Sequence, residues 1–269
     1  MEEENNAKYD PRIRRAKLKP HEGTSFKKII AVVSGKGGVG KSFVTSLLAV
    51  SLMNKGHKVS IMDADVTGPS IAKTFGKDTY TCMGDKNAIY PAETERGLTL
   101  ISSNNLLDDP TTPIVWRGSL ISSLVAQMFT EIVYGEKEFL LIDMPPGTGD
   151  VPLTVFQQLP IDGIVIVTSP QDLVSEVVLK SIKMAKMMNV SILGVVENMA
   201  YLKCPHCGEK INLFGKDNVQ ELLNNSDIPL LDRLGIDSSI TALIDEGKIE
   251  EYKGNDLENT VGAVEALIK

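Results

Sequence analysis

Short, continuously apolar runs alternate with longer segments of helical periodicity along most of the chain. Strands are predicted for the apolar runs 27–33, 57–63, 97–103, 138–144, 163–169 and 190–198. Helices are predicted for 42–56, 117–135 and 172–188, near 215–225 and within 237–269. Uninterrupted apolar strands are typical of a parallel sheet that is buried on both faces. The alternation therefore predicts a doubly wound, mostly parallel α/β domain with three layers, α/β/α.

The first part of the chain has a different pattern. Residues 1–26 are polar, charged and aperiodic, which predicts a flexible N-terminal tail. The remaining segment, 27–269, has the length of one large domain.

Composition excludes several function classes. The 269 residues carry a net charge of −7, which argues against general binding of nucleic acid. No apolar run reaches the roughly 18 residues of a membrane span, and the N-terminus lacks the apolar region of a secretory signal. Three cysteines are too few for a disulfide framework, so we expect a cytoplasmic protein with reduced thiols that acts on neither membranes nor nucleic acid.

The stretch GKGGVGKS, Gly35 to Ser42, fits the P-loop pattern G-x-x-x-x-G-K-[ST] and lies between a predicted strand and a predicted helix. Lys41 is expected to reach the β- and γ-phosphates of a nucleotide, and the Ser42 hydroxyl to bind Mg²⁺. The backbone amides around the phosphates are expected to come from Gly35, Lys36, Gly37, Gly38, Val39 and Gly40.

Carboxylates follow two of the predicted strands. Asp63 and Asp65 end one strand, and we assign Asp63 to Mg²⁺ support and Asp65 to orienting the attacking water. A helix-capping role for one of these two residues remains open. Asp143 ends a Walker B-like strand and is expected to hold Mg²⁺, and Gly147 in the following loop is expected to present its N–H near the γ-phosphate. No N-K-x-D guanine signature is present, which favours ATP over GTP.

Cys204 and Cys207 form a C-x-x-C turn inside the segment 199–213. A thioredoxin-like redox pair is one reading, but Gly208 directly after the second cysteine favours a turn over a helix start. A zinc site within one chain needs two further ligands, and Cys82 is interpreted as a small core residue. In a twofold dimer the turn occurs twice and supplies four thiolates, enough for a [4Fe–4S] cluster or for zinc in its place.

Lys36, directly after the first glycine, gives the loop a further feature. GKGGVGKS resembles the deviant Walker A motif of the ParA, MinD and nitrogenase iron protein class of P-loop NTPases. The resemblance implies that Lys36 reaches across a dimer interface to the phosphates bound by the partner chain, where it would neutralise charge during phosphoryl transfer. It also implies that Asn198 contacts adenine.

An ordered set of motifs is similar to the Mrp/ApbC/Nbp-type iron–sulfur carrier ATPases: VVSGKGGVGKS, DADVTGPS, VWRGSL, LIDMPPGTGD, VVENMAYLKCPHCGEKINLFG and LLDRLGIDSSI. The resemblance implies a slow ATPase that binds a [4Fe–4S] cluster between two subunits, through Cys204 and Cys207 of each, and passes it to apo-proteins. Thr67 stands where the family commonly has tyrosine. The alternative is a MinD- or ParA-type positioning ATPase whose cysteines bind structural zinc. The acidic character of ENTVGAVEALIK does not favour the membrane-binding form of that alternative.

Overall fold

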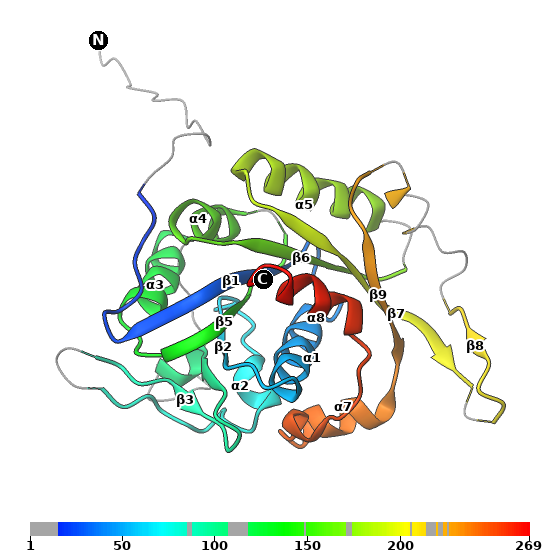
Figure 1. Cartoon of the computed structure of the whole chain (residues 1–269), viewed down its shortest axis with the longest axis horizontal. Coiled ribbons are helices and arrows are strands. Elements are labelled where there is room, and N and C mark those ends of the chain that lie inside the picture. Colours follow the sequence, from blue (N-terminus) through cyan, green and yellow to red (C-terminus); the bar gives the residue numbers. More distant parts are fainter. Residues whose placement is uncertain are drawn as a thin grey trace, which may run out of the picture.

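A mostly parallel sheet runs through the middle of the protein (Figure 1). The computed structural model describes residues 16–84, 88–106, 118–147, 149–170, 174–204, 206–213, 219, 223–224 and 226–269. In this part of the chain the strand order is β3-β4-β2-β5-β1-β6-β7-β8, and β9 also pairs with β7. Among the pairings of these named strands in the described residues, β3–β4 and β7–β8 are antiparallel and the others are parallel. The strands are β1 Thr24–Ser34, β2 Val59–Asp63, β3 Ala92–Glu93, β4 Thr99–Ile101, β5 Gly135–Asp143, β6 Gly163–Thr168, β7 Ile192–Lys203, β8 Lys210–Ile211 and β9 Leu230–Ile236.

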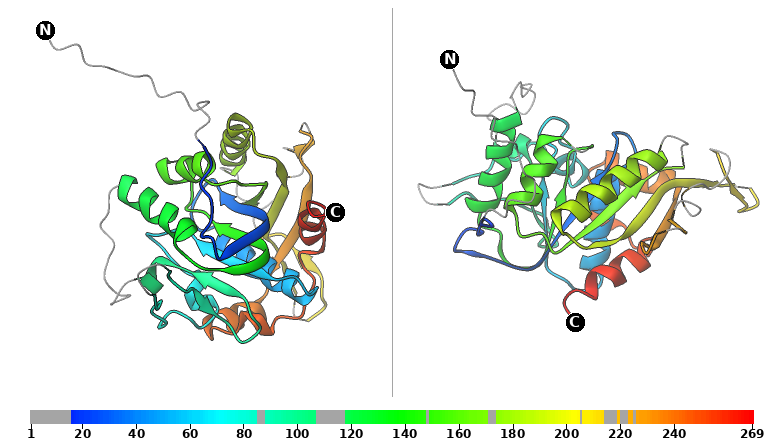
Figure 2. Two further views of the ribbon diagram at one scale, coloured as in Figure 1. Left: turned by 60° about the vertical axis from the view of Figure 1, so that its left-hand side comes forward. Right: turned by 90° about the horizontal axis from the view of Figure 1, so that it is seen from above.

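Helices cover both faces of the sheet (Figures 1 and 2). The helices are α1 Lys41–Asn54, α2 Ile71–Thr74, α3 Gly118–Thr130, α4 Asp150–Gln158, α5 Val174–Met188, α7 Ser238–Asp245 and α8 Glu258–Glu265, with 3-10 turns η1 Ser103–Leu106 and η2 Ile249–Glu251. Alternate side chains of β1 divide between the two cores: Ile29, Ala31 and Val33 pack under α3, α4 and α5. Ile30 and Val32 pack under α1, α2, α7 and α8. The predicted three-layer α/β fold is confirmed.

The helix that follows the P-loop is buried on nearly every side. All residues of α1 from Val44 to Leu52 are buried, as expected for a helix that is apolar around its whole circumference. This burial fixes the helix whose first turn forms part of the phosphate site. Among the described residues, no helix combines the length and the apolar character needed to cross a bilayer.

Several element boundaries differ from the predicted ones. The helix predicted for 117–135 ends at Thr130, because the chain turns there and enters β5 at Gly135. The strand predicted for 190–198 continues to Lys203 as β7. Helix α4 was not predicted. The helix predicted near 215–225 falls largely outside the described residues.

The first strand begins earlier than the predicted boundary at residue 27. β1 starts at Thr24, whose hydroxyl donates to the carbonyl of Ile132 (3.2 Å). Further upstream, the Leu18 amide donates to the carbonyl of Gln158 (2.8 Å), and the Lys17 ammonium donates to the carbonyl of Phe156 (2.6 Å). Lys17 and Leu18 therefore make specific contacts with α4, and Thr24 contacts Ile132 in the turn that follows α3.

Candidate nucleotide and cysteine sites

The P-loop lies at the carboxyl edge of the sheet, between β1 and α1. Gly38 and Gly40 adopt left-handed backbone conformations (φ 81° and 80°), which L-residues with side chains rarely adopt. Gly40 occupies the N-cap position of α1, and no side chain caps the helix there. The amides of the first turn are consequently available to an anion, and the helix dipole favours negative charge at this end.

Asn198 of β7 fixes the position of the P-loop through a side-chain hydrogen bond. Its side-chain amide is buried and donates to the carbonyl of Val39 (3.0 Å). A Cβ atom on Gly40 would lie 2.1 Å from the Asn198 Nδ2 atom, so only glycine fits beside this amide. The visible role of Asn198 is thus to position the loop, and its contact with adenine stays a prediction.

Asp143 is the centre of the site, at the end of β5. It is fully buried, and its Oδ2 atom lies 2.8 Å from the Lys41 ammonium and accepts a hydrogen bond from the Ser42 hydroxyl (2.6 Å). Its Oδ1 atom accepts from the Thr45 hydroxyl (2.8 Å). Thr45 was not predicted as a site residue. The available signal was its spacing, because residues three apart on a helix share a face and Thr45 follows Ser42 by three.

Asp63 and Asp65 lie next to this centre on the neighbouring strand. β2 and β5 are in parallel register, with Asp63 opposite Asp143. The Asp63 carboxylate accepts hydrogen bonds from the amides of Asp65 (3.1 Å), Ser70 (3.1 Å) and Ile71 (3.2 Å). Asp63 therefore makes the helix-start contacts that the sequence left open for one of the two residues, while its support of Mg²⁺ stays a prediction. Asp65 points its Oδ2 atom toward the Lys41 ammonium at 3.9 Å.

Three carboxylates thus surround one buried ammonium. Burial, followed by repulsion from Asp143, raises the pKa of Asp63 to about 7. Burial also raises the pKa of Asp65, although the Lys41 charge opposes the shift. The carboxylate oxygens and the Ser42 hydroxyl are oxygen donors of the kind that Mg²⁺ prefers, and the carboxylates carry a surplus of negative charge. Asp143 and Ser42 would be the residues to hold the ion, whose charge would offset that of the carboxylates and of a nucleotide.

Two other predicted residues lie in or beside the P-loop. Lys36 is half-buried in the loop, and its backbone carbonyl accepts from the Ser34 hydroxyl (3.0 Å). The Gly147 amide donates to the carbonyl of Ser34 (2.8 Å), so the loop after β5 is attached to the end of β1. In this conformation the Gly147 N–H already donates its hydrogen bond to the carbonyl of Ser34. Its predicted contact with a γ-phosphate would require the loop to shift.

Cys204 and Cys207 form the turn of a hairpin between β7 and β8. The pairs Leu202 with Ile211 and Lys203 with Lys210 define the antiparallel register. The Gly208 amide donates to the carbonyl of Cys204 (2.9 Å), and Gly208 has a left-handed conformation (φ 78°), which ends the turn. Both thiols are free, and Cys207 is exposed. Backbone amides of Cys207 and His206 lower the pKa of Cys204, which favours the thiolate needed for metal binding.

Among the described residues, no further histidine, cysteine, aspartate or glutamate joins the two hairpin cysteines as a potential metal ligand. The hairpin thus contributes two cysteine ligands per chain. Cys82, by contrast, packs against the core, and burial raises the pKa of its thiol to about 11. Its interpretation as a core residue agrees with this environment.

Fold and site together define a P-loop NTPase of the ParA/MinD-like class. The solved structure of MinD from Pyrococcus horikoshii with Mg-ADP has a TM-score of 0.60 at 21% identity, covering 91% of this chain and 97% of that chain, a likeness that shows the fold alone. A nucleotide-binding protein from Archaeoglobus fulgidus, solved with ADP, is more similar: the TM-score is 0.77 at 42% identity, covering 87% of this chain and 91% of that chain.

The family follows from the sequence comparisons. A family model described as ParA, NUBPL iron-transfer P-loop NTPase, matches residues 25–268, and the chain belongs to this family. An iron-sulfur cluster carrier protein from Clostridium perfringens is 44% identical over 244 residues, which covers 88% of this chain and 85% of that protein.

Proposed function

We propose that this protein is a cytoplasmic ATPase that binds a [4Fe–4S] cluster between two identical subunits and transfers it to apo-proteins. The observation that carries the proposal is the course of β7. This strand holds the P-loop through Asn198 and continues, six residues later, to Cys204 at the hairpin. At about 3.3 Å per strand residue, the six-residue step places Cys204 at most about 20 Å from Asn198, directly after the end of β7.

The nucleotide site supports the ATPase part of the proposal. Lys41 would bind the phosphates, Ser42 and Asp143 would hold Mg²⁺, and Asp65, beside the Lys41 ammonium, would orient the attacking water. Lys36 would act on the nucleotide of the partner chain. Hydrolysis is expected to be slow, because its role would be to control binding or release of the iron–sulfur cluster.

The hairpin supports the carrier part. Two exposed or half-exposed thiols at a turn form half of a four-thiolate site, and a second copy completes it by symmetry. Ile211 and Leu213 lie close in sequence to the cysteines and are 44% and 47% exposed. Exposed apolar side chains of this kind suit a subunit contact, and an iron–sulfur cluster held by one short turn per chain would be accessible for transfer.

Anaerobic reconstitution with iron and sulfide tests the proposal. The wild-type chain should acquire the visible absorbance of an iron–sulfur cluster and should activate an apo-enzyme that requires one. Cys204→Ala and Cys207→Ala should lose both properties, while the matched control Cys82→Ala should keep them, because Cys82 is partly buried against the core and is not part of the hairpin. A chain that binds no cluster, or that keeps it unchanged after Cys204→Ala, would refute the carrier function.

A further inference from the structure

A pocket separate from the nucleotide site and the cysteine hairpin lies between α1 and the segment that leads into α8. Its volume is about 600 Å³, and Ser51 and Lys55 line it from the α1 side. Lys253 and Leu257 line it from the C-terminal segment, and Arg96 reaches it from the turn between β3 and β4. We call it the α1–α8 pocket. Its volume lies within the range of small-molecule sites in proteins.

The floor of this pocket contains a polar group that lacks a partner. Ser51 is 7% exposed, and its Oγ atom is buried without a hydrogen-bond partner in the described part of the chain. Buried hydroxyl groups are almost always hydrogen-bonded, and leaving one unpaired is costly. A serine inside a helix can donate to the carbonyl four residues earlier, but Ser51 does not make this bond. The Oγ atom has almost no accessible surface in this conformation, so a ligand oxygen in the pocket would supply the missing partner once the Ser51 side chain rotates toward it.

Positive charge collects at the rim of the same pocket. The Arg96 guanidinium donates only to neutral acceptors, the Glu250 carbonyl (2.8 Å) and the Asn54 side-chain oxygen (2.9 Å). Among the described residues, neither Arg96 nor Lys253 has a carboxylate within ion-pair distance, whereas Lys55 pairs with Glu265 at 3.2 Å. The lining contains three cations and one carboxylate, that of Glu258. In a chain with a net charge of −7, this local surplus of positive charge indicates an anionic ligand.

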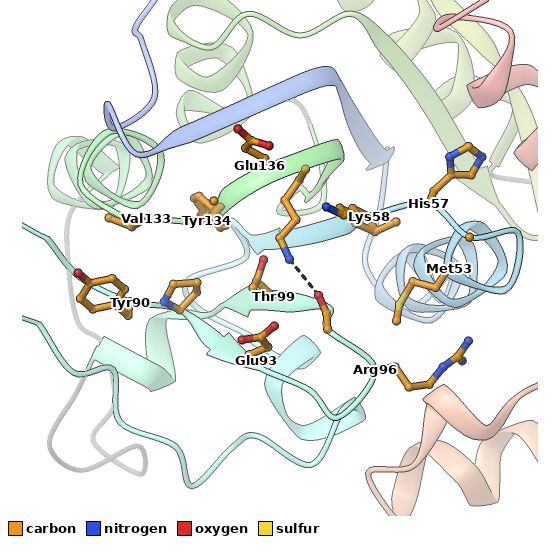
Figure 3. Close-up of a pocket in the computed structure, with 16 residues that line it drawn as sticks. Met53, His57, Lys58, Tyr90, Glu93, Arg96, Thr99, Val133, Tyr134 and Glu136 are labelled. Carbon is orange, nitrogen blue, oxygen red and sulfur yellow. Dashed lines mark hydrogen bonds between the residues drawn. The ribbon is translucent and has the colours of Figure 1, made fainter.

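The adjacent pocket in Figure 3 differs in its charge balance. Its volume is about 720 Å³, and Arg96 stands at its border with the α1–α8 pocket. Its lining has three cations, Lys58, Arg96 and Lys137, against two carboxylates, Glu93 and Glu136, so its positive excess is smaller than the three cations to one carboxylate of the α1–α8 pocket. The Lys137 ammonium also donates to the carbonyl of Gly97 (2.9 Å), the dashed line in Figure 3. The larger pocket therefore lacks the combination of excess positive charge and an unpartnered buried hydroxyl.

We propose that the α1–α8 pocket binds a small molecule that carries a phosphate or carboxylate group, with Ser51, Lys253 and Arg96 as its oxygen-binding residues. Ser51 follows Lys41 by ten residues on α1, which corresponds to about 15 Å along the helix, so the site is separate from the P-loop. Leu257 and Val261 form an apolar wall, which favours an anion attached to a short apolar body over a bare inorganic ion.

Amide chemical shifts of the ¹⁵N-labelled chain, saturated with ADP and Mg²⁺ to occupy the P-loop, test this proposal. Inorganic phosphate, butyl phosphate and butyrate are titrated separately at constant ionic strength. Saturable shifts are expected around Ser51, Lys55 and Lys253, with butyl phosphate binding at least threefold more tightly than inorganic phosphate. Tighter binding of butyl phosphate than of butyrate identifies a phosphate site, and the reverse order identifies a carboxylate site. Shifts that do not saturate with any probe would overturn the proposal.

Variants separate a ligand site from general screening of charge. Lys253→Ala should weaken binding at least threefold, while Lys73→Ala, which removes an equal charge from an exposed position outside the pocket, should leave it unchanged. Ser51→Ala should also weaken binding at least threefold and yet unfold at the same or a higher temperature, because the hydroxyl has no partner to lose. Equal binding by Lys253→Ala and wild type, or a lower unfolding temperature of Ser51→Ala, would overturn the assignment.

Discussion

At the scale of single residues, Asp143 organises the nucleotide site. Its two oxygens receive the Lys41 ammonium and two hydroxyl groups of α1, and it has no exposed surface. A buried carboxylate is tolerated only when such partners satisfy it. The partners therefore contribute both to the stability of the fold and to the placement of Lys41 and Ser42.

A substitution of Thr45 measures how much a hydrogen bond to Asp143 stabilises the fold, without changing Lys41 or Ser42. Thr45→Val keeps the shape of the side chain and removes the donor to Asp143, so the free energy of unfolding should fall by about 1.5–3 kcal/mol, the range for hydrogen bonds to charged groups. Urea denaturation without nucleotide measures the change. As a control, Thr241→Val removes an exposed hydroxyl that donates to a carbonyl of its own helix start, and it should change stability by less than about 0.5 kcal/mol. Equal losses in both variants would contradict this role of Thr45.

The hydrogen bonds of Glu138, in the first half of β5, predict that the free energy of unfolding depends on pH. Hydrogen bonds from Lys27 and then His57 lower its pKa from 4.5 to about 2. Because the folded-state pKa is depressed, this stabilisation is fully present above about pH 4.5 and is lost as the pH falls toward 2. Glu138→Gln should therefore be less stable than wild type near neutral pH, with a difference that shrinks below pH 4.5. The exposed substitution Glu95→Gln should show no such trend, and a Glu138→Gln difference that does not depend on pH would contradict the prediction.

At the scale of elements, β7 connects the two candidate sites. Asn198 holds the P-loop, and the next residue, Met199, has a left-handed conformation (φ 57°) although it is not glycine. The pairing of β7 with β9 shifts register between Glu197 and Tyr201, around this residue. Strained backbone in such a position persists only where surrounding contacts enforce it. β7 therefore carries local strain between the P-loop contact and the cysteine hairpin.

Two substitutions at Met199 measure that strain. Met199→Ala and Met199→Gly remove the same long side chain, but only glycine adopts a positive φ without a steric cost. Met199→Gly should therefore be the more stable variant by about 1 kcal/mol in urea denaturation. A Met199→Ala variant that equals or exceeds Met199→Gly in stability would show that the conformation is not strained.

Much of this arrangement could be predicted from the sequence, for identifiable reasons. The P-loop and Asp143 follow apolar strands, and parallel strands place their carboxyl ends at one edge of the sheet. The hydrogen bonds of Asp63 to the first amides of α2 could not be predicted, because they depend on how the loop 64–70 folds back onto its oxygens. The extension of β7 to Lys203 depends on pairing with the end of β9 and with the two-residue strand β8, contacts between segments far apart in the sequence or too short to show a pattern of their own.

At the scale of the whole molecule, the proposed function requires two chains. One chain supplies two thiolates at the hairpin, and Lys36 is expected to serve the nucleotide of a partner. The hairpin and the P-loop follow strands of the same sheet at their carboxyl ends. A twofold axis that passes near both would bring the two hairpins together and also place Lys36 near the nucleotide of the partner.

A complementation experiment tests Lys36. Lys36→Ala and Lys41→Ala should each lower ATP turnover at least about tenfold. When the two variants are mixed and allowed to exchange subunits, turnover should recover to roughly a quarter of the wild-type value, because half of the dimers are mixed and each has one complete site. No recovery on mixing, or full turnover by Lys36→Ala alone, would contradict a role across the interface.

The most direct test of the central claim is native mass spectrometry of the anaerobically reconstituted chain. The account predicts a species with the mass of two chains and one [4Fe–4S] cluster, and its absence in Cys204→Ala and in Cys207→Ala. A cluster bound to a single chain, or a dimer that carries one complete cluster on each chain, would contradict a site shared between two subunits.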